Sequence, residues 1–170
     1  MKIKSNSLSY ILVLLLAVFI GSINTQASEN DEKAVKQAVS QFYVALNEMF
    51  KGNIEPMKEV WSHAVDVTYM GPTGGIKIGC QQVLADWEAQ AAMKLGGTVK
   101  PENMTITVGN NLAFTTNYEK GSNINAEGKP QEVSIRATNT FRKEDGKWKM
   151  IGHHTDLLPF LQSNRLIYDL

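Results

Sequence analysis

The stretch VSIRATNTFRKEDGKWKMIGHHTD, residues Val133–Asp156, decides the fold. At its centre lies Asp145-Gly146, a pair typical of a two-residue β-hairpin turn, because Gly readily adopts the positive φ that such turns need. Aromatic and β-branched residues on both sides predict two long antiparallel strands. The second strand ends in the polar sequence His153-His154-Thr155-Asp156. The hairpin therefore predicts a sheet and also a place where polar groups gather.

The two faces of this hairpin have different compositions. A two-residue loop would pair residue 139 with residue 152, and paired residues share a face of the sheet. The face with Phe141 and Trp148 is mostly apolar and is expected to line the core. Asn139, His154 and Asp156 are predicted at its far end, where the core grades into a pocket. The opposite face is expected to meet solvent or a partner subunit, and it carries Arg136, Thr138, Thr140, Arg142, Lys149, Ile151, His153 and Thr155.

Upstream of the hairpin, apolar residues recur at spacings of three and four, which is typical of helices packed on a core. Shorter alternating segments bounded by Gly, Pro and Asn predict further strands. The predicted order is helix 35–50, short helix 55–61, strands 65–70 and 76–78, helix 80–95, strands 104–108 and 112–120, then the hairpin. This order indicates an α+β fold, a cone-shaped curved antiparallel sheet with helices packed on its concave face.

The N-terminus has the features of an export signal. Lys2 and Lys4 precede an apolar run from Leu8 to Ile20, which is shorter than the roughly 20 residues of a membrane span. Cleavage is predicted after Ala27, which would leave a periplasmic or secreted protein with no stable membrane anchor; a permanent N-terminal anchor is the alternative. The predicted division is signal peptide 1–27, one folded domain 28–158 and C-terminal tail 159–170.

Composition excludes several classes of function. Seventeen basic and 17 acidic residues give a formal net charge of zero, so no charge pattern favours nucleic acid. The single cysteine, Cys80, cannot form an internal disulfide. Metal binding needs three or four converging ligands, and the three histidines are His63 and the adjacent His153 and His154, so no metal site is expected. No glycine-rich phosphate loop occurs, and no cofactor is expected.

His154 is the main candidate for acid–base chemistry, because the ordinary pKa of histidine lies near neutrality. Asp156, two residues later, would point the same way and could orient the imidazole. The alternative is a buried histidine satisfied by its neighbours. Three aromatic residues, Trp61, Tyr69 and Trp87, are expected to line a ligand pocket together with Asn139 and His154. For each aromatic residue the alternative is packing in the core.

Several short motifs together point to a known family: Phe42-Tyr43-x-Ala45-Leu46, Trp61-Ser62-His63, Asp66–Pro72, Trp87, Arg136-Ala137-Thr138, Asp145–Trp148 and His153–Asp156. With these motifs the chain resembles the SnoaL-like, ketosteroid-isomerase-like branch of the nuclear transport factor 2 superfamily. The resemblance covers about residues 31–158, and the end of the hairpin is also similar to the association domain of calcium/calmodulin-dependent kinases. The resemblance implies a cone-shaped α+β barrel, a pocket between helices and sheet, and usually a dimer through the outer face of the sheet.

Two departures from the ketosteroid isomerases bear on function. Those enzymes place a catalytic Asp just before a Pro that follows the first strand, whereas Met70-Gly71 precedes Pro72 here. Relatives often carry His-x-His on the last strand, whereas Gly152 takes the first position here and leaves His154 alone. Ketosteroid isomerase activity itself is therefore not expected.

Three functions remain open at the level of sequence. The first is an exported protein that binds a small apolar or aromatic molecule in its cone. The second is an enzyme of the isomerase, cyclase or hydratase type that uses His154 and Asp156 for proton transfer without a cofactor. The third is an oligomeric accessory module that acts through the outer sheet face, where a homodimer is expected.

Overall fold

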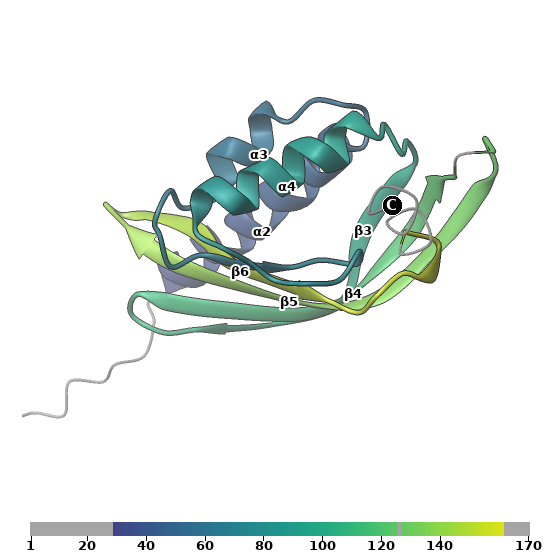
Figure 1. The fold of residues 1–170 in the computed structure, drawn as a ribbon. Helices are drawn as coiled ribbons and strands as arrows, with labels where there is room; N and C mark the ends of the chain where they lie inside the picture. The colour runs from purple at the N-terminus through teal and green to yellow at the C-terminus, as the bar shows by residue number, and fades with distance from the viewer. Residues whose placement is uncertain (1–28, 126, 162–170) are drawn as a thin grey trace, which may run out of the picture.

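A computed structural model describes residues 29–125 and 127–161 of the chain, so the predicted signal peptide and residues 162–170 of the predicted tail lie outside the described residues. Figure 1 shows a single curved sheet whose concave face is covered by helices. The predicted α+β architecture is confirmed. None of the helices in the described part is long and apolar enough to cross a membrane.

The elements follow the predicted order. They are α2 (Glu29–Met49), α3 (Glu55–Val60), β1 (Thr68–Met70), β2 (Lys77–Ile78), α4 (Cys80–Ala92), β3 (Thr98–Val108), β4 (Leu112–Ile124), β5 (Pro130–Glu144) and β6 (Lys147–Thr155). The strand β3 begins six residues before its predicted start, at Thr98, and the added residues pair with the far end of β4. The first predicted strand is shorter than expected, and Val65 is exposed.

The sheet has the order β2-β1-β6-β5-β4-β3. Strands β3 to β6 form an antiparallel meander, as predicted. One pair differs from the prediction, because β1 runs parallel to β6. No hairpin connects these two strands, so nothing forces them to run in opposite directions. This pairing places Tyr69 of β1 directly beside His153 of β6.

The turn between β5 and β6 has the predicted geometry. Asp145 and Gly146 both have positive φ, 48° and 79°, as a type I′ turn requires. The flanking residues Glu144 and Lys147 pair with each other, and the pairs that follow keep this register as far as Phe141 and Met150. The turn therefore sets which face of the hairpin enters the core.

Beyond Met150 the register shifts by one residue. Thr140 pairs with Gly152, so Ile151 is the extra residue of a β-bulge. Asn139 then lies opposite His153, and the predicted pairing of residues 139 and 152 is wrong. Side chains alternate between the two faces along a strand, so one extra residue moves every later side chain of β6 to the face opposite to the predicted one. His153 is buried as a result, and His154 is exposed.

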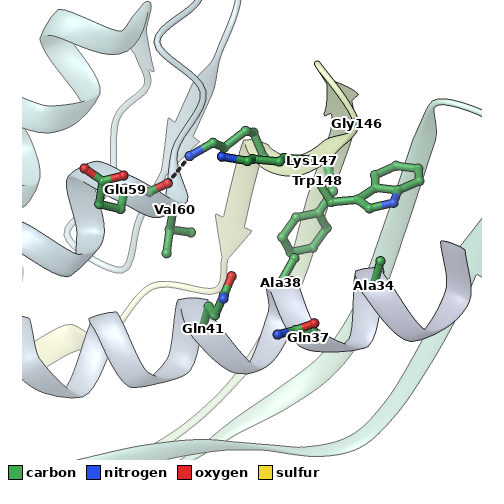
Figure 2. Close-up of a pocket in the computed structure, with 11 residues that line it drawn as sticks. Ala34, Gln37, Ala38, Gln41, Glu59, Val60, Gly146, Lys147 and Trp148 are labelled. Carbon is green, nitrogen blue, oxygen red and sulfur yellow. Dashed lines mark hydrogen bonds between the residues drawn. The ribbon is translucent and has the colours of Figure 1, made fainter. Parts of the chain in front are cut away.

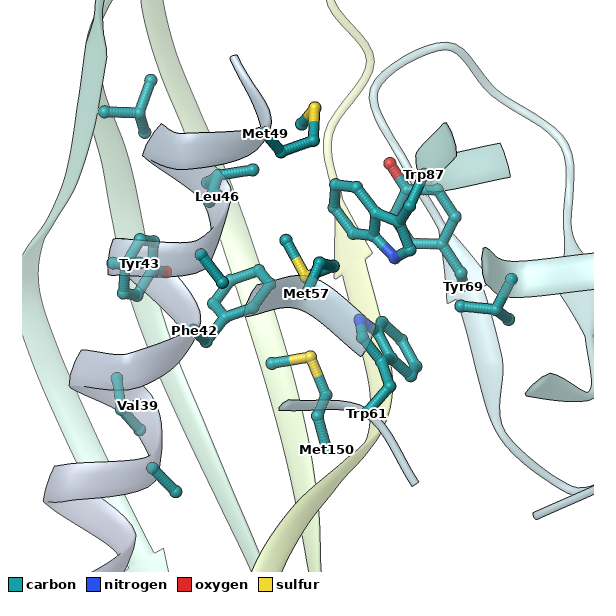
Figure 3. Close-up of a cluster of buried hydrophobic side chains, with 14 of the residues drawn as sticks. Val39, Phe42, Tyr43, Leu46, Met49, Met57, Trp61, Tyr69, Trp87 and Met150 are labelled. Atoms are coloured by element: carbon teal, nitrogen blue, oxygen red, sulfur yellow. The ribbon is translucent and has the colours of Figure 1, made fainter. Parts of the chain in front are cut away.

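The core fills the space between the helices and the concave side of the sheet. Its largest fully buried side chains include Phe42 of α2, Trp87 of α4, Tyr69 of β1 and Met150 of β6, together with Trp61 just after α3. Figure 3 shows these rings gathered around the two methionines Met57 and Met150. The aromatic contacts are edge-on or tilted, with Trp61 and Tyr69 nearly perpendicular at 84° and 6.4 Å between centroids.

A substitution at the turn tests its role in stability. We expect Gly146→Ala to lower the free energy of unfolding by about 1–2 kcal/mol, because alanine is strained at positive φ. Asp145→Asn is the matched control, since asparagine tolerates this region, and it should change stability by less than about 0.5 kcal/mol. Urea denaturation followed by circular dichroism measures both. Equal stability of wild type and Gly146→Ala would contradict the proposed strain.

Candidate functional site

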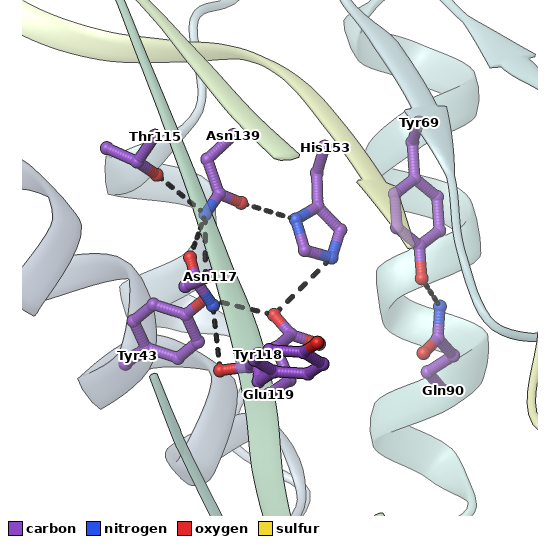
Figure 4. A network of polar contacts seen from close by, with 9 residues as sticks. All are labelled: Tyr43, Tyr69, Gln90, Thr115, Asn117, Tyr118, Glu119, Asn139 and His153. Carbon is purple, nitrogen blue, oxygen red and sulfur yellow. Dashed lines mark hydrogen bonds and ion pairs between the residues drawn. The ribbon is translucent and has the colours of Figure 1, made fainter. Parts of the chain in front are cut away.

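A network of buried polar side chains lies inside the cone (Figure 4). The inner face of β4 contributes Thr115, Asn117 and Glu119, and the next two strands of the sheet, β5 and β6, contribute Asn139 and His153. All five are at least 93% buried. Burying so many polar groups is costly unless they bond to one another or to a ligand. The buried polar network is therefore the main candidate for a functional site.

Glu119 is the central group of this network. It is 4% exposed and accepts a hydrogen bond of 3.1 Å from the hydroxyl of Tyr43 on α2. No lysine or arginine in residues 29–125 and 127–161 forms an ion pair with it. Burial raises the pKa of Glu119 to about 7, and the Tyr43 hydrogen bond opposes this only in part. The side chain can therefore exist as acid or as base near neutral pH.

His153 lies next to Glu119, with 3.9 Å between its Nε2 and the carboxyl Oε1. Its Nδ1 is 2.6 Å from the amide oxygen of Asn139, and this oxygen can only accept, so Nδ1 carries the hydrogen. The lone pair of Nε2 is left on the side of Glu119 (Figure 4). Burial, with a smaller contribution from the adjacent His154, lowers the pKa of His153 to about 3. The ring is therefore neutral at physiological pH.

Two asparagines orient the network. The amide nitrogen of Asn139 donates to the hydroxyl of Thr115 at 3.1 Å, which leaves its oxygen free to hold His153. The amide nitrogen of Asn117 donates to the Tyr43 hydroxyl at 2.8 Å, so the proton of that hydroxyl is directed to Glu119. Each side chain thus fixes the hydrogen-bonding direction of the next, an arrangement that pre-organises a site.

A cavity borders the network on one side. Its wall includes Tyr69, Trp87, Glu119 and His153, and apolar residues make up most of the remainder: Leu46, Phe50, Leu95, Val99, Val133, Ile135, Leu158 and Leu161. Its volume is about 30 Å³, enough for one or two waters. The composition of this wall, apolar with a few converging polar groups, is typical of a ligand site, whereas pockets for organic ligands are about ten times larger.

Tyr69 places a phenol in this wall. Its oxygen accepts a 2.8 Å hydrogen bond from the amide nitrogen of Gln90, and that amide group can only donate. Burial raises the pKa of Tyr69 well above its usual value, so the phenol keeps its proton. Gly71 lies so close that a Cβ there would be 2.0 Å from the phenol oxygen, so a larger residue at this position would displace the Tyr69 ring. The ring stacks on His153 at 5.7 Å.

The four residues predicted as neutral pocket groups are all buried. Tyr69 and Trp87 line the cavity. Trp61 and Asn139 do not line it: Trp61 packs on the rings of Tyr69 and Trp87, and Asn139 bonds to His153. Their roles toward a ligand stay a prediction.

The predicted positions of His154 and Asp156 are wrong. The bulge at Ile151 turns His154 to the outer face, where it is exposed. Asp156 lies on the same face and binds the guanidinium of Arg136 through both carboxylate oxygens, each at 2.8 Å. Hydrogen bonds from Arg136 lower the pKa of Asp156 to about 2. Neither side chain faces the cavity, so the site does not contain the predicted pair.

The sequence did contain a signal for Glu119 that was missed. Strand β4 alternates polar residues on both faces, which is typical of a strand exposed to solvent. Pairing it with β5, however, places Glu119 opposite Ile135 and Asn117 opposite Ala137. Because paired residues share a face, β4 must turn these polar groups toward the core. Tyr43 was predicted only as part of a motif, although it lies on the buried face of α2.

A second hollow lies at the other end of the molecule, between α2, α3 and the β5–β6 turn (Figure 2). It is larger, about 270 Å³, and its wall includes Gln37, Gln41, Lys147 and Trp148. The ammonium group of Lys149 donates to the backbone oxygen of Glu59 across it. This groove is open and holds no buried titratable side chain, so the cone cavity is the stronger candidate.

Solved structures share the fold. A proposed dehydratase of the NTF2-like family from Streptomyces avermitilis is 21% identical with a TM-score of 0.68, over 78% of this chain and 99% of that one. A proposed calcium/calmodulin-dependent protein kinase type II association domain from Thiobacillus denitrificans is 23% identical with a TM-score of 0.62, over 72% and 94%. A proposed ketosteroid isomerase from Shewanella frigidimarina is 22% identical with a TM-score of 0.59, over 72% and 94%.

No curated protein gives a significant match. A sequence model of the SnoaL-like domain, in contrast, matches residues 35–157, from the first turns of α2 to just past the end of β6. The match includes every strand of the sheet and every residue of the polar network. The chain therefore belongs to the SnoaL-like family.

Proposed function

We propose that the protein binds a small, mostly apolar, oxygen-bearing molecule in the cone cavity. We further propose that Glu119 removes a proton from a carbon of this molecule and returns it to the same or a neighbouring carbon. The observation that carries this proposal is Glu119 itself, a carboxyl group buried without a cation beside a neutral His153. A buried ionisable group without a partner of opposite charge weakens a fold, and such groups cluster at functional sites. The proposed chemistry is of the isomerase or hydratase type.

The pKa of Glu119 suits this role. General acid–base catalysis is most efficient when the catalytic pKa lies near the working pH, and burial brings this carboxyl group to about 7. His153 is a weaker base, because its pKa is about 3. It is better suited to accept a hydrogen bond at Nε2, either from the protonated Glu119 or from a hydroxyl group of the ligand.

The cavity also offers hydrogen-bond donors for a ligand oxygen. The contacts of Tyr69 leave its phenol proton uncommitted, since Gln90 already donates to its oxygen. Trp87 also lines the cavity, and its buried indole N–H has no partner among the described residues. Donors fixed in a water-poor site stabilise the negative charge that develops on an oxygen during proton abstraction.

These groups support one sequence of steps. The carboxylate of Glu119 removes a proton from the carbon beside a carbonyl group, which leaves an enolate and a neutral Glu119. Tyr69 donates a hydrogen bond to the enolate oxygen. Glu119 then returns the proton to the same or a neighbouring carbon, so the carboxylate is regenerated. Two of the structural neighbours are a proposed dehydratase and a proposed ketosteroid isomerase, names consistent with proton transfer.

Exchange of carbon-bound hydrogen tests this chemistry without the natural substrate. Small cyclic ketones such as cyclopentanone in D₂O should lose α-protons faster with the protein than in buffer, as followed by proton NMR. We expect Glu119→Gln to reduce the protein-dependent rate by about 10²–10⁴-fold, because the amide cannot act as a base.

Glu132→Gln is the matched control, since Glu132 lies on the adjacent strand β5 and is exposed. The Glu132→Gln variant should catalyse the loss of ketone α-protons at the wild-type rate. Equal rates for Glu119→Gln and wild type would remove Glu119 from the mechanism. If wild type exchanges no ketone faster than buffer, ligand binding without chemistry becomes the better proposal.

Glu119 also makes a prediction for stability. Between pH 4.5, its ordinary pKa, and pH 7, the folded state keeps a proton that the unfolded state has released. Stability therefore falls as pH rises through this window, by about 3 kcal/mol for this group. We expect the difference in unfolding free energy between wild type and Glu119→Gln to change by this amount from pH 4 to pH 8. A constant difference would show that Glu119 has an ordinary pKa.

We further propose that the outer sheet face forms a homodimer. The large apolar residues Leu112, Phe114 and Tyr118 of β4 are 43–50% exposed on this face, next to the Arg136–Asp156 ion pair. Clusters of exposed apolar side chains often mark an interface between proteins.

Light scattering should give a dimer at micromolar concentration for wild type. We expect Phe114→Glu and Arg136→Glu to weaken association at least tenfold. Val44→Glu is the control, because Val44 is also apolar and 59% exposed but lies on α2. A wild-type monomer would rule out this interface.

A further inference from the structure

Gln90 holds the phenol of Tyr69, and a second contact sets the orientation of Gln90 itself. Its amide nitrogen donates to the Tyr69 oxygen at 2.8 Å (Figure 4) and to a carboxylate oxygen of Asp86 at 2.9 Å. Asp86 and Gln90 are four residues apart on α4, so their side chains lie on the same side of the helix. Both hydrogens of the amide nitrogen are therefore committed, one to each neighbour.

An ion pair holds the carboxylate of Asp86 in turn. Its other oxygen lies 3.4 Å from the ammonium group of Lys77 on β2. Lys77 is the cross-strand partner of Tyr69, so these two side chains leave the sheet on the same face. Lys77 and Asp86 are partly exposed, whereas Gln90 and Tyr69 are buried. A chain of polar contacts thus runs from the protein surface to the cavity wall, in the order Lys77, Asp86, Gln90, Tyr69.

Asp86 decides which end of the Gln90 amide faces Tyr69. The nitrogen and the oxygen of a side-chain amide occupy similar space, so a turned Gln90 would place its oxygen at both contacts. A carboxylate that is paired with lysine can only accept hydrogen bonds, and an amide oxygen beside it would have no hydrogen to offer. The amide nitrogen must therefore face Asp86, and the oxygen of Tyr69 receives the second N–H.

We infer that Asp86 is a positioning residue for the cavity, because through Gln90 it makes the phenol of Tyr69 a hydrogen-bond donor there. The phenol oxygen already accepts the N–H of Gln90, and its proton has no acceptor among residues 29–125 and 127–161. Tyr69 therefore meets a ligand with its proton, which selects a carbonyl or another acceptor oxygen over a donor such as an ammonium group. This consequence rests on the proposed function, in which Tyr69 donates to an enolate oxygen.

The variant Asp86→Asn should reverse the direction of this chain without changing its shape. The ammonium group of Lys77 can only donate, so the new amide turns its oxygen to Lys77 and its nitrogen to Gln90. Gln90 then presents its oxygen, and the Tyr69 hydroxyl donates to it instead of into the cavity. The tyrosine Fermi doublet of the Raman spectrum distinguishes a phenol that donates from one that only accepts. Subtracting the spectrum of Tyr69→Phe in each background isolates the Tyr69 signal.

Glu88→Gln is the matched control for the Raman measurement. Glu88 also lies on α4 and forms an ion pair, 3.3 Å from Lys58, but its carboxylate has no hydrogen bond to Gln90. We expect the doublet of an accepting phenol in wild type and in Glu88→Gln, and that of a donating phenol in Asp86→Asn. A donating Tyr69 in wild type, or an unchanged doublet in the folded Asp86→Asn protein, would overturn the inference.

Ketone exchange gives a second readout, which tests whether Asp86 acts through Tyr69. Asp86→Asn should lower the protein-dependent rate by about tenfold or more in the wild-type background, but by less than about twofold in a Tyr69→Phe background. Equal losses in both backgrounds would overturn the inference, because Asp86 would then act by another route. The Raman readout needs neither ligand nor turnover. A protein that shows the expected doublets but exchanges no ketone would therefore contradict the proposed reaction and still support the positioning of Tyr69 by Asp86.

Discussion

One extra residue in the last strand determines the chemistry of the interior. Ile151 forms a bulge, and beyond it every side chain of β6 lies on the face opposite to the one that a regular hairpin would give. His153 enters the cone and meets Asn139, Glu119 and Tyr69, while His154 moves to the outer face with Asp156. The bulge also marks where β1 joins the sheet, since Thr68 pairs with Gly152. The network and the stacked Tyr69 both depend on this shift.

Most of the fold could be predicted from local patterns. Three features are specified by residues that are neighbours in the sequence, and their predictions are confirmed: the apolar stripe of α2, the positive-φ turn at Asp145-Gly146 and the alternation along β5. The inner face of the hairpin was also correct as far as Met150. The position of a bulge cannot be predicted in this way, because it depends on how β6 shares its hydrogen bonds with β5 and with β1. No residue type is specific to a bulge, so the prediction placed the site residues after Ile151 on the wrong face.

Glu119 was missed for a related reason. A polar residue on an alternating strand has the same local pattern whether it faces water or a pocket, and only the partner strand distinguishes the two. Burying the carboxyl group of Glu119 costs free energy, which explains why several neighbouring side chains are arranged around it by hydrogen bonds. Tyr43 donates to the carboxyl group, Asn117 and Asn139 fix Tyr43 and His153, and the helices exclude water. A network of this kind holds its groups in place, but it does not remove the penalty of ionising the carboxyl group.

The absence of a nearby cation among the described residues makes the cavity responsive to the charge of what fills it. A neutral molecule that fills the cavity would raise the pKa of Glu119 further, so its binding near pH 7 takes up a proton and tightens in acid. An amine would supply the missing positive charge, lower that pKa and release a proton on binding. The direction of proton flow, measured from the dependence of binding enthalpy on the buffer, therefore reveals the charge of an unknown ligand.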